Sequence, residues 1–352
     1  MDDGATLEQI LDLRSPAHGS AELSGAVAQS VLNMAEAAAR LSDLIARPQP
    51  SGRLGAAVGG ANSDGDMQRE LDLVAEGLLS AALRKSPVAC YLSEETEAAI
   101  LFDPAGLLAV AVDPLDGSSN IDLNGPVGTI FSIFPTVPTA VADPALAFRQ
   151  TGRAQIAAGF FIYGPQTALV LSIGQGVSVF ALSRETGKFL LVSSGLTIPA
   201  ATPEYAINAS NYRHWQEPVQ SYIDDCVKGA DGPRGRNFNM RWIASLVADS
   251  YRIFLRGGIF LYPADARKGY EQGRLRLLYE ANPIAFLAEQ AGGGATDGVD
   301  PILDRVPTSL HQRIPLVMGS ADKVELVRQY HMDISPPNRE SPLFGRRGLM
   351  RG

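Results

Sequence analysis

Two aspartates, Asp113 and Asp116, interrupt an apolar part of the chain in the segment VAVDPLDGSSNID, residues 110–122. The run GLLAVAV, residues 106–112, has the length and composition of a β-strand that is covered on both faces. A strand that ends at Val112 places the first aspartate in the crevice beyond its carboxyl end, where open α/β sheets bind ligands. An isolated Asp-Pro-Leu-Asp sequence is more often an ordinary β-turn, so the pattern needs support from its neighbours.

The residues that follow Asp116 supply that support. Gly117 permits a close approach of the main chain to a ligand, and Ser118 and Ser119 offer hydroxyl and amide donors for an oxyanion. Carboxylates beside such donors attract a phosphate only when a cation lies between them. Mg²⁺ prefers carboxylate oxygens together with substrate phosphate oxygens. The segment therefore predicts a site for magnesium and a phosphate group.

Further acids lie at the ends of other expected elements. The segment VACYLSEE, residues 88–95, predicts a short strand that ends in two acids. LRLLYE, residues 275–280, predicts a strand that ends in an acid directly before a helix beginning at Pro283. A second helix is expected within residues 66–85, with acids flanking its start, where the helix dipole alone would favour them. These acids are Glu94, Glu95, Glu280, Asp66 and Asp72.

Composition excludes several classes of protein. The chain has 352 residues, of which 45% are hydrophobic and 19% charged, as in a well-packed globular protein. A net charge of -8 argues against nucleic acid as a partner. Cys90 and Cys226 are expected to be buried core residues rather than a disulfide. The acidic N-terminus is unlike a signal peptide and no apolar run approaches the roughly 20 residues of a membrane span, so a cytoplasmic protein is expected.

The order of elements predicts an α/β fold in two halves. A helix over residues 26–46 is broken by RPQPSGRLG, a strand is expected over residues 128–134, and residues 155–194 have the pattern of consecutive strands. Helices and strands alternate after about residue 202. We expect an N-terminal half with the metal motif (1–200), a C-terminal half (201–334) and a disordered, basic tail (335–352).

Six blocks together resemble class I fructose-1,6-bisphosphatase: VDPLDGSSN, LSEE, GDMQRELD, RWIASLVAD, GGIFLYPA and GRLRLLYEANPIAFLAEQAGG. The resemblance extends over roughly residues 20–330. DPLDGSSN alone occurs throughout the lithium-sensitive, Mg²⁺-dependent phosphatases, including inositol monophosphatases, whereas GGIFLYPA and LRLLYE are more specific to the bisphosphatases. The resemblance implies a layered αβαβα sandwich of the sugar phosphatase type, two halves in one chain, and a homotetramer.

The resemblance also implies a metal centre and a water-activating pair. Its cofactor is Mg²⁺, two or more ions per subunit, which Mn²⁺ can replace. Glu95 and Asp72 match the pair that helps to activate the attacking water, and Asp66 matches a nearby acidic position. The implied metal ligands are Glu94, Asp113, Asp116, Glu280 and the carbonyl group of Leu115.

Other positions match the substrate contacts of the family. Arg241 matches an arginine that reaches into a neighbouring subunit's site. Arg274 stands where the family has lysine, and Trp242 stands where a tyrosine commonly contacts the 6-phosphate. The implied 1-phosphate cradle is Asp116, Gly117, Ser118 and Ser119. The residues implied around the sugar and 6-phosphate are Asn208, Gly258, Phe260, Leu261, Tyr262 and Arg274.

The expected activity is hydrolysis of the 1-phosphate of fructose 1,6-bisphosphate, in gluconeogenesis or the Calvin cycle. Sedoheptulose-1,7-bisphosphatase activity, alone or in addition, is the main alternative, because sequence does not measure the length of the sugar pocket. A non-catalytic sugar-phosphate sensor is disfavoured because every metal-binding acid is present. A monophosphatase is disfavoured because Arg241 and Arg274 imply a second phosphate site.

Regulation by AMP, known in other members of the family, is not expected here. The family's AMP phosphate is held by the start of the first helix and by a lysine, with a tyrosine and an arginine completing the site. The helix start is kept as GSAELS, but the other positions are Leu107, Leu108 and Pro135. Cys90 and Cys226 do not form the cysteine cluster of the redox-regulated type. The sequence therefore predicts an enzyme insensitive to AMP and to thiol redox state.

Overall fold

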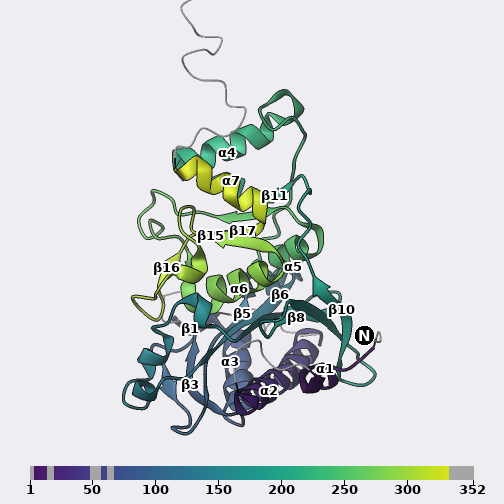
Figure 1. Cartoon of the computed structure of the whole chain (residues 1–352), viewed down its shortest axis with the longest axis vertical. Helices are drawn as coiled ribbons and strands as arrows, with labels where there is room; N and C mark the ends of the chain where they lie inside the picture. The colour runs from purple at the N-terminus through teal and green to yellow at the C-terminus, as the bar shows by residue number, and fades with distance from the viewer. Residues whose placement is uncertain (1–3, 14–19, 48–56, 62–66, 333–352) are drawn as a thin grey trace, which may run out of the picture.

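The computed structural model describes residues 4–13, 20–47, 57–61 and 67–332. These segments form five alternating layers of helices and sheets, as Figure 1 shows from bottom to top. The first layer contains α1 (Leu7–Leu13), α2 (Ala21–Ile45) and α3 (Glu70–Leu83). A two-stranded sheet of β1 (Ala57–Ala61) and β2 (Met67–Arg69) precedes α3.

The second layer is an eight-stranded sheet in the order β10-β9-β8-β7-β6-β5-β3-β4. All neighbouring strands are antiparallel except β3 and β5, which are parallel. The strands are β3 (Val88–Ser93), β4 (Ile100–Leu101), β5 (Leu108–Asp116), β6 (Val127–Pro135), β7 (Ala157–Tyr163), β8 (Thr167–Ser172), β9 (Val177–Leu182) and β10 (Phe189–Leu196).

Two helices separate this sheet from a second, five-stranded sheet in the order β12-β11-β13-β17-β15 (Figure 1). The separating helices are α5 (Leu246–Arg256) and α6 (Asn282–Gln290). The strands are β11 (Glu204–Ala206), β12 (Asn239–Met240), β13 (Ile259–Tyr262), β15 (Gly293–Thr296) and β17 (Leu316–Ser320). The outer layer consists of α4 (Glu217–Val227) and α7 (Ala321–His331). Separately, β14 (Leu275–Arg276) and β16 (Arg313–Ile314) form a short two-stranded antiparallel sheet.

Helix α2 begins five residues before the apolar pattern that predicts it. The Ser20 side chain accepts a hydrogen bond from the main-chain nitrogen of Leu23 and caps the helix. Val27, Val31 and Leu41 lie on the buried face, packed with α3 against the first sheet. The helix therefore owes its start to the cap and its position to the apolar stripe.

Strand β5 is buried along its whole length, as the continuous apolar run predicts. Val110 and Val112 pack toward α2 and α3, whereas Ala109 and Ala111 pack on the opposite side with Phe134. The prediction that the strand ends at Val112 is wrong, because β5 continues to Asp116.

The prediction of a strand that ends at Glu280 is also wrong. Only Leu275–Arg276 is a strand, and residues Leu277–Ala281 form a π-helical turn that leads directly into α6. Pro283 is accordingly the second residue of α6 rather than its first. The apolar residues of LRLLYE are buried as expected, but a periodicity argument cannot separate a buried strand from a buried helical turn over so few residues.

Cys90 and Cys226 are buried and free, as expected. Among the described residues, we find no helix with both the length and the apolar character needed to cross a membrane. The expected tail, residues 335–352, lies outside the described residues.

Candidate active site

A cavity of about 430 Å³ opens at the carboxyl ends of β3 and β5. Because these strands are parallel, with Ser93 opposite Val112, their ends lie at the same edge of the sheet. The main-chain nitrogen of Glu94 donates to the carbonyl oxygen of Val112, at 3.1 Å. The cavity is lined by Asp72, Glu94, Glu95, Asp113, Leu115, Asp116, Gly117, Ser118, Ser119, Tyr262, Arg274, Leu275, Arg276 and Glu280.

Three buried carboxylates meet in this cavity. Asp113, Asp116 and Glu280 each offer an oxygen, and these oxygens lie within 4.8 Å of one another. The three residues are only 2%, 8% and 5% exposed. Their convergence supports the predicted metal centre, because like charges at this separation repel unless protons or a cation intervene.

The pKa values show how the acids respond to this environment. Burial, followed by the nearby Glu94, Glu280 and Asp116 carboxylates, raises the pKa of Asp113 well above its ordinary value. Burial likewise raises the pKa of Asp116 to about 6 and that of Glu280 to about 8. Without a cation, the ionised cluster is therefore unfavourable at neutral pH.

Helix α5 holds Asp116 in place from the other half of the chain. The main-chain nitrogen of Val247 donates to Asp116 Oδ2 at 2.9 Å, and the Ser245 hydroxyl donates to the same oxygen at 3.3 Å. Asn120 Nδ2 donates to the carbonyl oxygen of Ala244 at 2.9 Å. The predicted phosphate motif is thus joined to the segment that enters α5.

The turn after Asp116 requires glycine. Gly117 has φ of 74° and precedes the short 3₁₀ helix Ser118–Leu123. A Cβ atom at Gly117 would lie 3.3 Å from both the Asn120 and Ser245 side chains. The left-handed conformation and the tight space both disfavour a side chain at position 117. The turn that glycine allows there brings the serines that follow to the cavity.

A second cavity of about 270 Å³ continues from the first. Trp242, Phe260 and Tyr262 lie along it, and their ring centroids are 5.8 to 6.1 Å apart in a stacked arrangement. Asn208 also lines it, as the sequence predicts. The residues shared by the two cavities are Asp116, Ser119, Tyr262, Arg274 and Leu275.

Arg276 is a cavity residue that the sequence analysis missed. Its Nη2 lies 2.9 Å from Glu94 Oε1, and its main-chain nitrogen donates to Glu280 Oε2 at 2.5 Å. It lies two residues after Arg274, and residues two apart in an extended segment point to the same side, so this spacing was a signal that could have placed both side chains at one cavity. Ser245 was likewise missed, although it lies in the quoted RWIASLVAD block.

Some predicted residues do not line either cavity. Leu261 is fully buried, in a cluster of the C-terminal sheet with Ile259 and Val317, so its side chain does not reach either cavity. Arg241 lines neither cavity, and its Nε lies 3.9 Å from Glu204 Oε1. Asp66 lies outside the described residues.

Gly258 also lines neither cavity and binds the Ser320 hydroxyl through its main-chain nitrogen. Asp72, at the start of α3, and Glu95, just after β3, line the first cavity as expected. The phosphate-cradle residues Gly117, Ser118 and Ser119 line it too.

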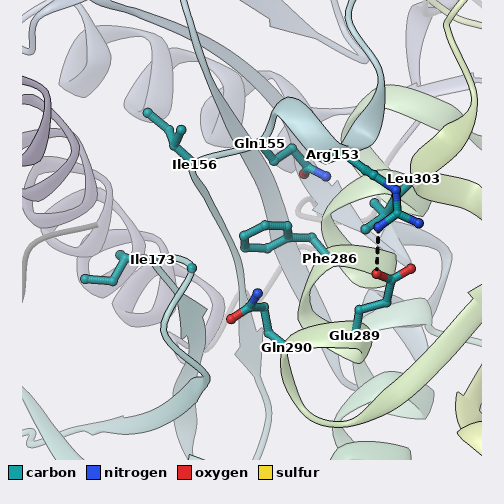
Figure 2. Close-up of a pocket in the computed structure, with 9 residues that line it drawn as sticks. Arg153, Gln155, Ile156, Ile173, Phe286, Glu289, Gln290 and Leu303 are labelled. Carbon is teal, nitrogen blue, oxygen red and sulfur yellow. Dashed lines mark hydrogen bonds and ion pairs between the residues drawn. The ribbon is translucent and has the colours of Figure 1, made fainter. Parts of the chain in front are cut away.

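Another cavity, of about 240 Å³, lies against α6 and shares no lining residue with the first two (Figure 2). Phe286 projects into it, and the dashed contact in the figure joins Arg153 Nη1 to Glu289 Oε2 at 3.1 Å. Its lining includes one carboxylate, which is already paired. It therefore lacks the converging acids of the first cavity.

Comparison with known proteins decides the family. Residues 15–194 match the model for the N-terminal domain of fructose-1-6-bisphosphatase, and residues 198–332 match its C-terminal domain. The chain is 53% identical to a class 1 fructose-1,6-bisphosphatase of Rhizobium meliloti (strain 1021), with 99% of each chain covered. It is 51% identical to that of Rhodopseudomonas palustris (strain HaA2), with 100% of each covered.

The chain belongs to the class I fructose-1,6-bisphosphatase family. The crystal structure of Leishmania major fructose-1,6-bisphosphatase in holo form superposes with a TM-score of 0.86 at 34% sequence identity, covering 94% of this chain and 100% of the other. The predicted layered α/β sandwich of this family is therefore confirmed. Divalent-metal dependence follows from the family, and the cluster of Asp113, Asp116 and Glu280 provides oxygen ligands that fit such an ion.

Proposed function

We propose that the chain hydrolyses the 1-phosphate of fructose 1,6-bisphosphate to fructose 6-phosphate and phosphate. One observation carries the proposal: two cavities of different chemistry are continuous through Asp116, Ser119, Tyr262, Arg274 and Leu275. The first is rich in carboxylates, and the second combines aromatic rings with an arginine. A substrate with a phosphate at each end of a sugar matches this arrangement.

The metal ions of this proposal are Mg²⁺, two or more per subunit, with Mn²⁺ as a substitute. When bound, they would neutralise the charge of the phosphate and of the attacking and leaving oxygens. The protein's part is to supply oxygen ligands. A hydrogen bond from the main-chain nitrogen of Leu115 to Asp113 Oδ1, at 3.1 Å, orients that carboxylate. The ligands would be Glu94, Asp113, Asp116, Glu280 and the carbonyl oxygen of Leu115.

Glu95 and Asp72 would receive the proton of the attacking water. Both line the acidic cavity, but neither belongs to the tight cluster of Asp113, Asp116 and Glu280. A carboxylate that is not engaged by a metal keeps the basicity that proton acceptance needs. Asp66 belongs to the same proposal through its position in the family segment.

The start of the 3₁₀ helix would hold the 1-phosphate. Gly117, Ser118 and Ser119 line the acidic cavity directly after the Asp116 carboxylate. Their hydroxyl and amide groups would donate hydrogen bonds to phosphate oxygens. The scissile bond is thereby oriented between donors and carboxylates.

Arg274 would hold the 6-phosphate. Its guanidinium lies 4.7 Å from the Tyr270 ring centroid, which limits the orientations it can take. Asn208, Phe260 and Tyr262 would contact the sugar from the second cavity, with Leu261 contributing through its main chain. The fork of a guanidinium suits phosphate oxygens better than the lysine usual in this family.

Arg241 would complete the site of a neighbouring subunit in a homotetramer. Its side chain is 50% exposed at the end of the edge strand β12, and Met240 and Ile243 beside it are 43% and 40% exposed. Apolar side chains at an open strand edge are typical of a surface that another chain covers. The proposal also places the two halves at 1–200 and 201–334, and the protein in the cytoplasm.

Phosphate release by the purified chain tests the proposal directly. Fructose 1,6-bisphosphate, sedoheptulose 1,7-bisphosphate and fructose 6-phosphate are compared, each with Mg²⁺ and with EDTA. Release from the first substrate with Mg²⁺ is expected to exceed release from the monophosphate. A higher kcat/KM with sedoheptulose 1,7-bisphosphate would favour that activity instead, and undiminished turnover in EDTA would refute the metal centre.

A further inference from the structure

Hydrogen-bond donors gather on the outer side of the second sheet, far from the acidic cavity. They come from α4, from α7 and from the loop that leads into β12 (Figure 1). Phe238, on that loop, packs against the core formed by α4 and α7. The residues of this group, which we call the basic cluster, are Tyr222, Cys226, Arg234, Arg236 and Lys323.

Lys323 is the deepest cation of the basic cluster. It is 2% exposed, and its ammonium group forms no hydrogen bond or ion pair with any described residue. Burial lowers its pKa to about 8, and the positive charges of Arg236 and Arg234 contribute to this decrease. Burying an ammonium group without a counter-charge costs free energy, and a bound anion would lower that cost.

The two arginines are less buried than this lysine, since Arg234 is partly buried and Arg236 is exposed. The Arg234 guanidinium lies 5.1 Å from the Tyr222 ring centroid and 4.8 Å from that of Phe238. Arg236 lies 5.1 Å from the same Phe238 centroid, and its Nη1 donates to the carbonyl oxygen of Ala201 at 3.3 Å. Among the described residues, neither guanidinium forms an ion pair with a carboxylate.

Two groups of α4 add further donors but no negative charge. The Tyr222 hydroxyl is fully buried, and its polar neighbours are the Arg234 guanidinium and the Cys226 thiol, neither of which supplies a negative charge. Arg234 Nη1 approaches Cys226 Sγ at 3.8 Å, but burial raises the pKa of this thiol to about 11, so it is neutral. Asp225, the neighbouring acid, already accepts from Lys228 and from the Tyr330 hydroxyl, each at 2.7 Å.

We propose that the basic cluster is a binding site for a phosphate group. Two guanidinium groups and an ammonium group match a doubly charged tetrahedral oxyanion, and the Tyr222 hydroxyl provides a fourth donor. The net charge of the whole chain is -8, so this local excess of cations is not a general property of its surface. The phosphate group comes either from inorganic phosphate or from a phosphate ester.

The basic cluster is connected to the candidate active site through the chain. After Phe238, strand β12 leads to Trp242 and Ser245, of which the first lines the sugar cavity and the second donates to Asp116. A phosphate bound by Arg234 and Arg236 would fix the start of this segment. The site is nevertheless separate from the proposed chemistry, since none of its residues lines either cavity.

Calorimetric titration of the full chain in EDTA tests the proposal. In the absence of metal, the carboxylates of the acidic cavity repel phosphate, and the titrations are made in an Arg274→Ala background to remove the proposed 6-phosphate site, which leaves the basic cluster as the expected site. Inorganic phosphate and glycerol 3-phosphate are titrated in turn, with chloride at equal ionic strength as the reference anion. The variants are Lys323→Met and Arg236→Gln, and Lys85→Met, an exposed lysine elsewhere, controls for the loss of one positive charge.

We expect one phosphate to bind per chain, with affinity unchanged in Lys85→Met and at least about tenfold weaker in Lys323→Met and Arg236→Gln. Arg236 is exposed, so its variant keeps the test valid if Lys323→Met does not fold. Tighter binding of glycerol 3-phosphate would identify an ester, and equal binding would identify the phosphate group alone. Unchanged affinity in Arg236→Gln, no phosphate binding by the parent chain, or binding of chloride in place of phosphate would overturn the proposal.

Discussion

The acidic cavity and the basic cluster each bring like charges together, but they differ in the burial of the charged groups and in how the repulsion can be relieved. In the cavity, Asp113, Asp116 and Glu280 are buried within 4.8 Å of one another. Among the three cations of the basic cluster, only Lys323 is deeply buried, whereas Arg234 is partly buried and Arg236 is exposed. Carboxylates can relieve repulsion by binding protons, whereas a guanidinium stays charged at every physiological pH.

This difference affects how each region behaves without its ligand. The pKa values of Asp116 and Glu280, about 6 and about 8, show that the empty acidic cavity can take up protons near neutrality. Near neutral pH, the basic cluster can release a proton from Lys323, whose pKa is about 8, while the Cys226 thiol, with a pKa of about 11, keeps its proton. We infer that a cation competes with protons in the first region, whereas an anion meets permanent positive charge in the second.

The largest expected effect comes from removing a carboxylate of the acidic cavity. Asp113→Asn or Glu280→Gln should lower kcat/KM by more than the roughly 10- to 100-fold typical of losing an outer metal partner, because a direct anionic ligand is lost. Steady-state phosphate release across a Mg²⁺ titration measures this. Asp103→Asn, at an exposed position outside the cavity, is the matched control. Wild-type kcat/KM in both cavity variants would show that the cluster does not bind the catalytic metal.

Arg274→Ala should raise KM at least about tenfold. Loss of a charge-assisted phosphate contact costs about 1.5–3 kcal/mol. Arg267 is a suitable control because it also lies over the Tyr270 ring, at 4.6 Å, but lines neither cavity. Arg267→Ala should change stability, through loss of its pair with Asp265, and leave KM unchanged. The same rise in KM for both variants would mean that the ring contact, not the phosphate, explains the effect.

Arg241→Ala tests the proposed contribution across subunits. KM should rise by a similar factor in the assembled protein, because the lost contact is again between a guanidinium and a phosphate. Mixing this variant with an Arg274→Ala chain gives a sharper measurement. A neighbour's Arg241 restores activity only if the arginine acts in trans, so no recovery in well-exchanged mixtures would place Arg241 outside the site.

Metal removal should make the stability of the protein depend on pH. Asp116 and Glu280 have pKa values of about 6 and about 8 in the fold, against ordinary values of 3.8 and 4.5. The fold therefore favours their protonated forms, and this contribution is complete below about pH 4 and lost as pH rises through 6 to 8. In EDTA, Tm should fall by several degrees between pH 5 and pH 8.

Magnesium should reverse that fall most strongly at pH 8, because it replaces the lost protons. Glu280→Gln supplies a control, since it removes one of the two titrations and should make the fall in EDTA shallower. Thermal unfolding followed by circular dichroism gives both measurements. A Tm in EDTA that is constant across this range, or steeper in Glu280→Gln, would contradict the assigned protonation of the cavity.

Much of the acidic cavity was predictable because its residues follow strand ends in recognisable blocks. Glu94 comes directly after β3, and Asp113 lies in β5 just beyond the last residue that pairs with β3, so burial of the strands and the position of the acids belong to one pattern. Glu280 was correctly assigned to the site although its local structure was wrong, since a π-helical turn delivers it. The family resemblance assigned Glu280 to the site, whereas periodicity predicted the wrong local structure for it.

The basic cluster could not be predicted in the same way. Tyr222, Arg234 and Lys323 come from two helices and a loop, and no spacing in the sequence indicates that they meet. Arg276 shows the same limitation inside the active site, where its ion pair with Glu94 joins segments far apart in the chain. Contacts that depend on the packing of separate layers are settled by tertiary structure, which periodicity does not encode.

The smallest expected effect is that of AMP on the rate. The segment that matches the family's AMP site lacks the family's cations. The first long helix keeps its cap at Ser20, so one part of a phosphate site remains. Leu108 is fully buried in β5 and lies opposite Pro135 of β6, and Leu107 is partly buried beside it. Where the family offers a lysine, a tyrosine and an arginine, a phosphate here would meet apolar side chains. Two lost charged contacts, at about 1.5–3 kcal/mol each, weaken binding at least a hundredfold.

Initial rates at saturating Mg²⁺ should therefore stay constant across an AMP titration through cellular concentrations. AMP also carries a phosphate group, so the basic cluster is a second place for it to bind besides the start of α2, and Lys323→Met distinguishes the two. Inhibition that disappears in Lys323→Met would assign the nucleotide to the basic cluster and leave the reading of Leu107, Leu108 and Pro135 intact. Half-inhibition at low micromolar AMP that persists in this variant would show that the helix start binds AMP without the missing cations. Such a result would mean that a buried apolar surface accepts a dianion without the cations that the basic cluster supplies, against the cost of burying an unpaired charge.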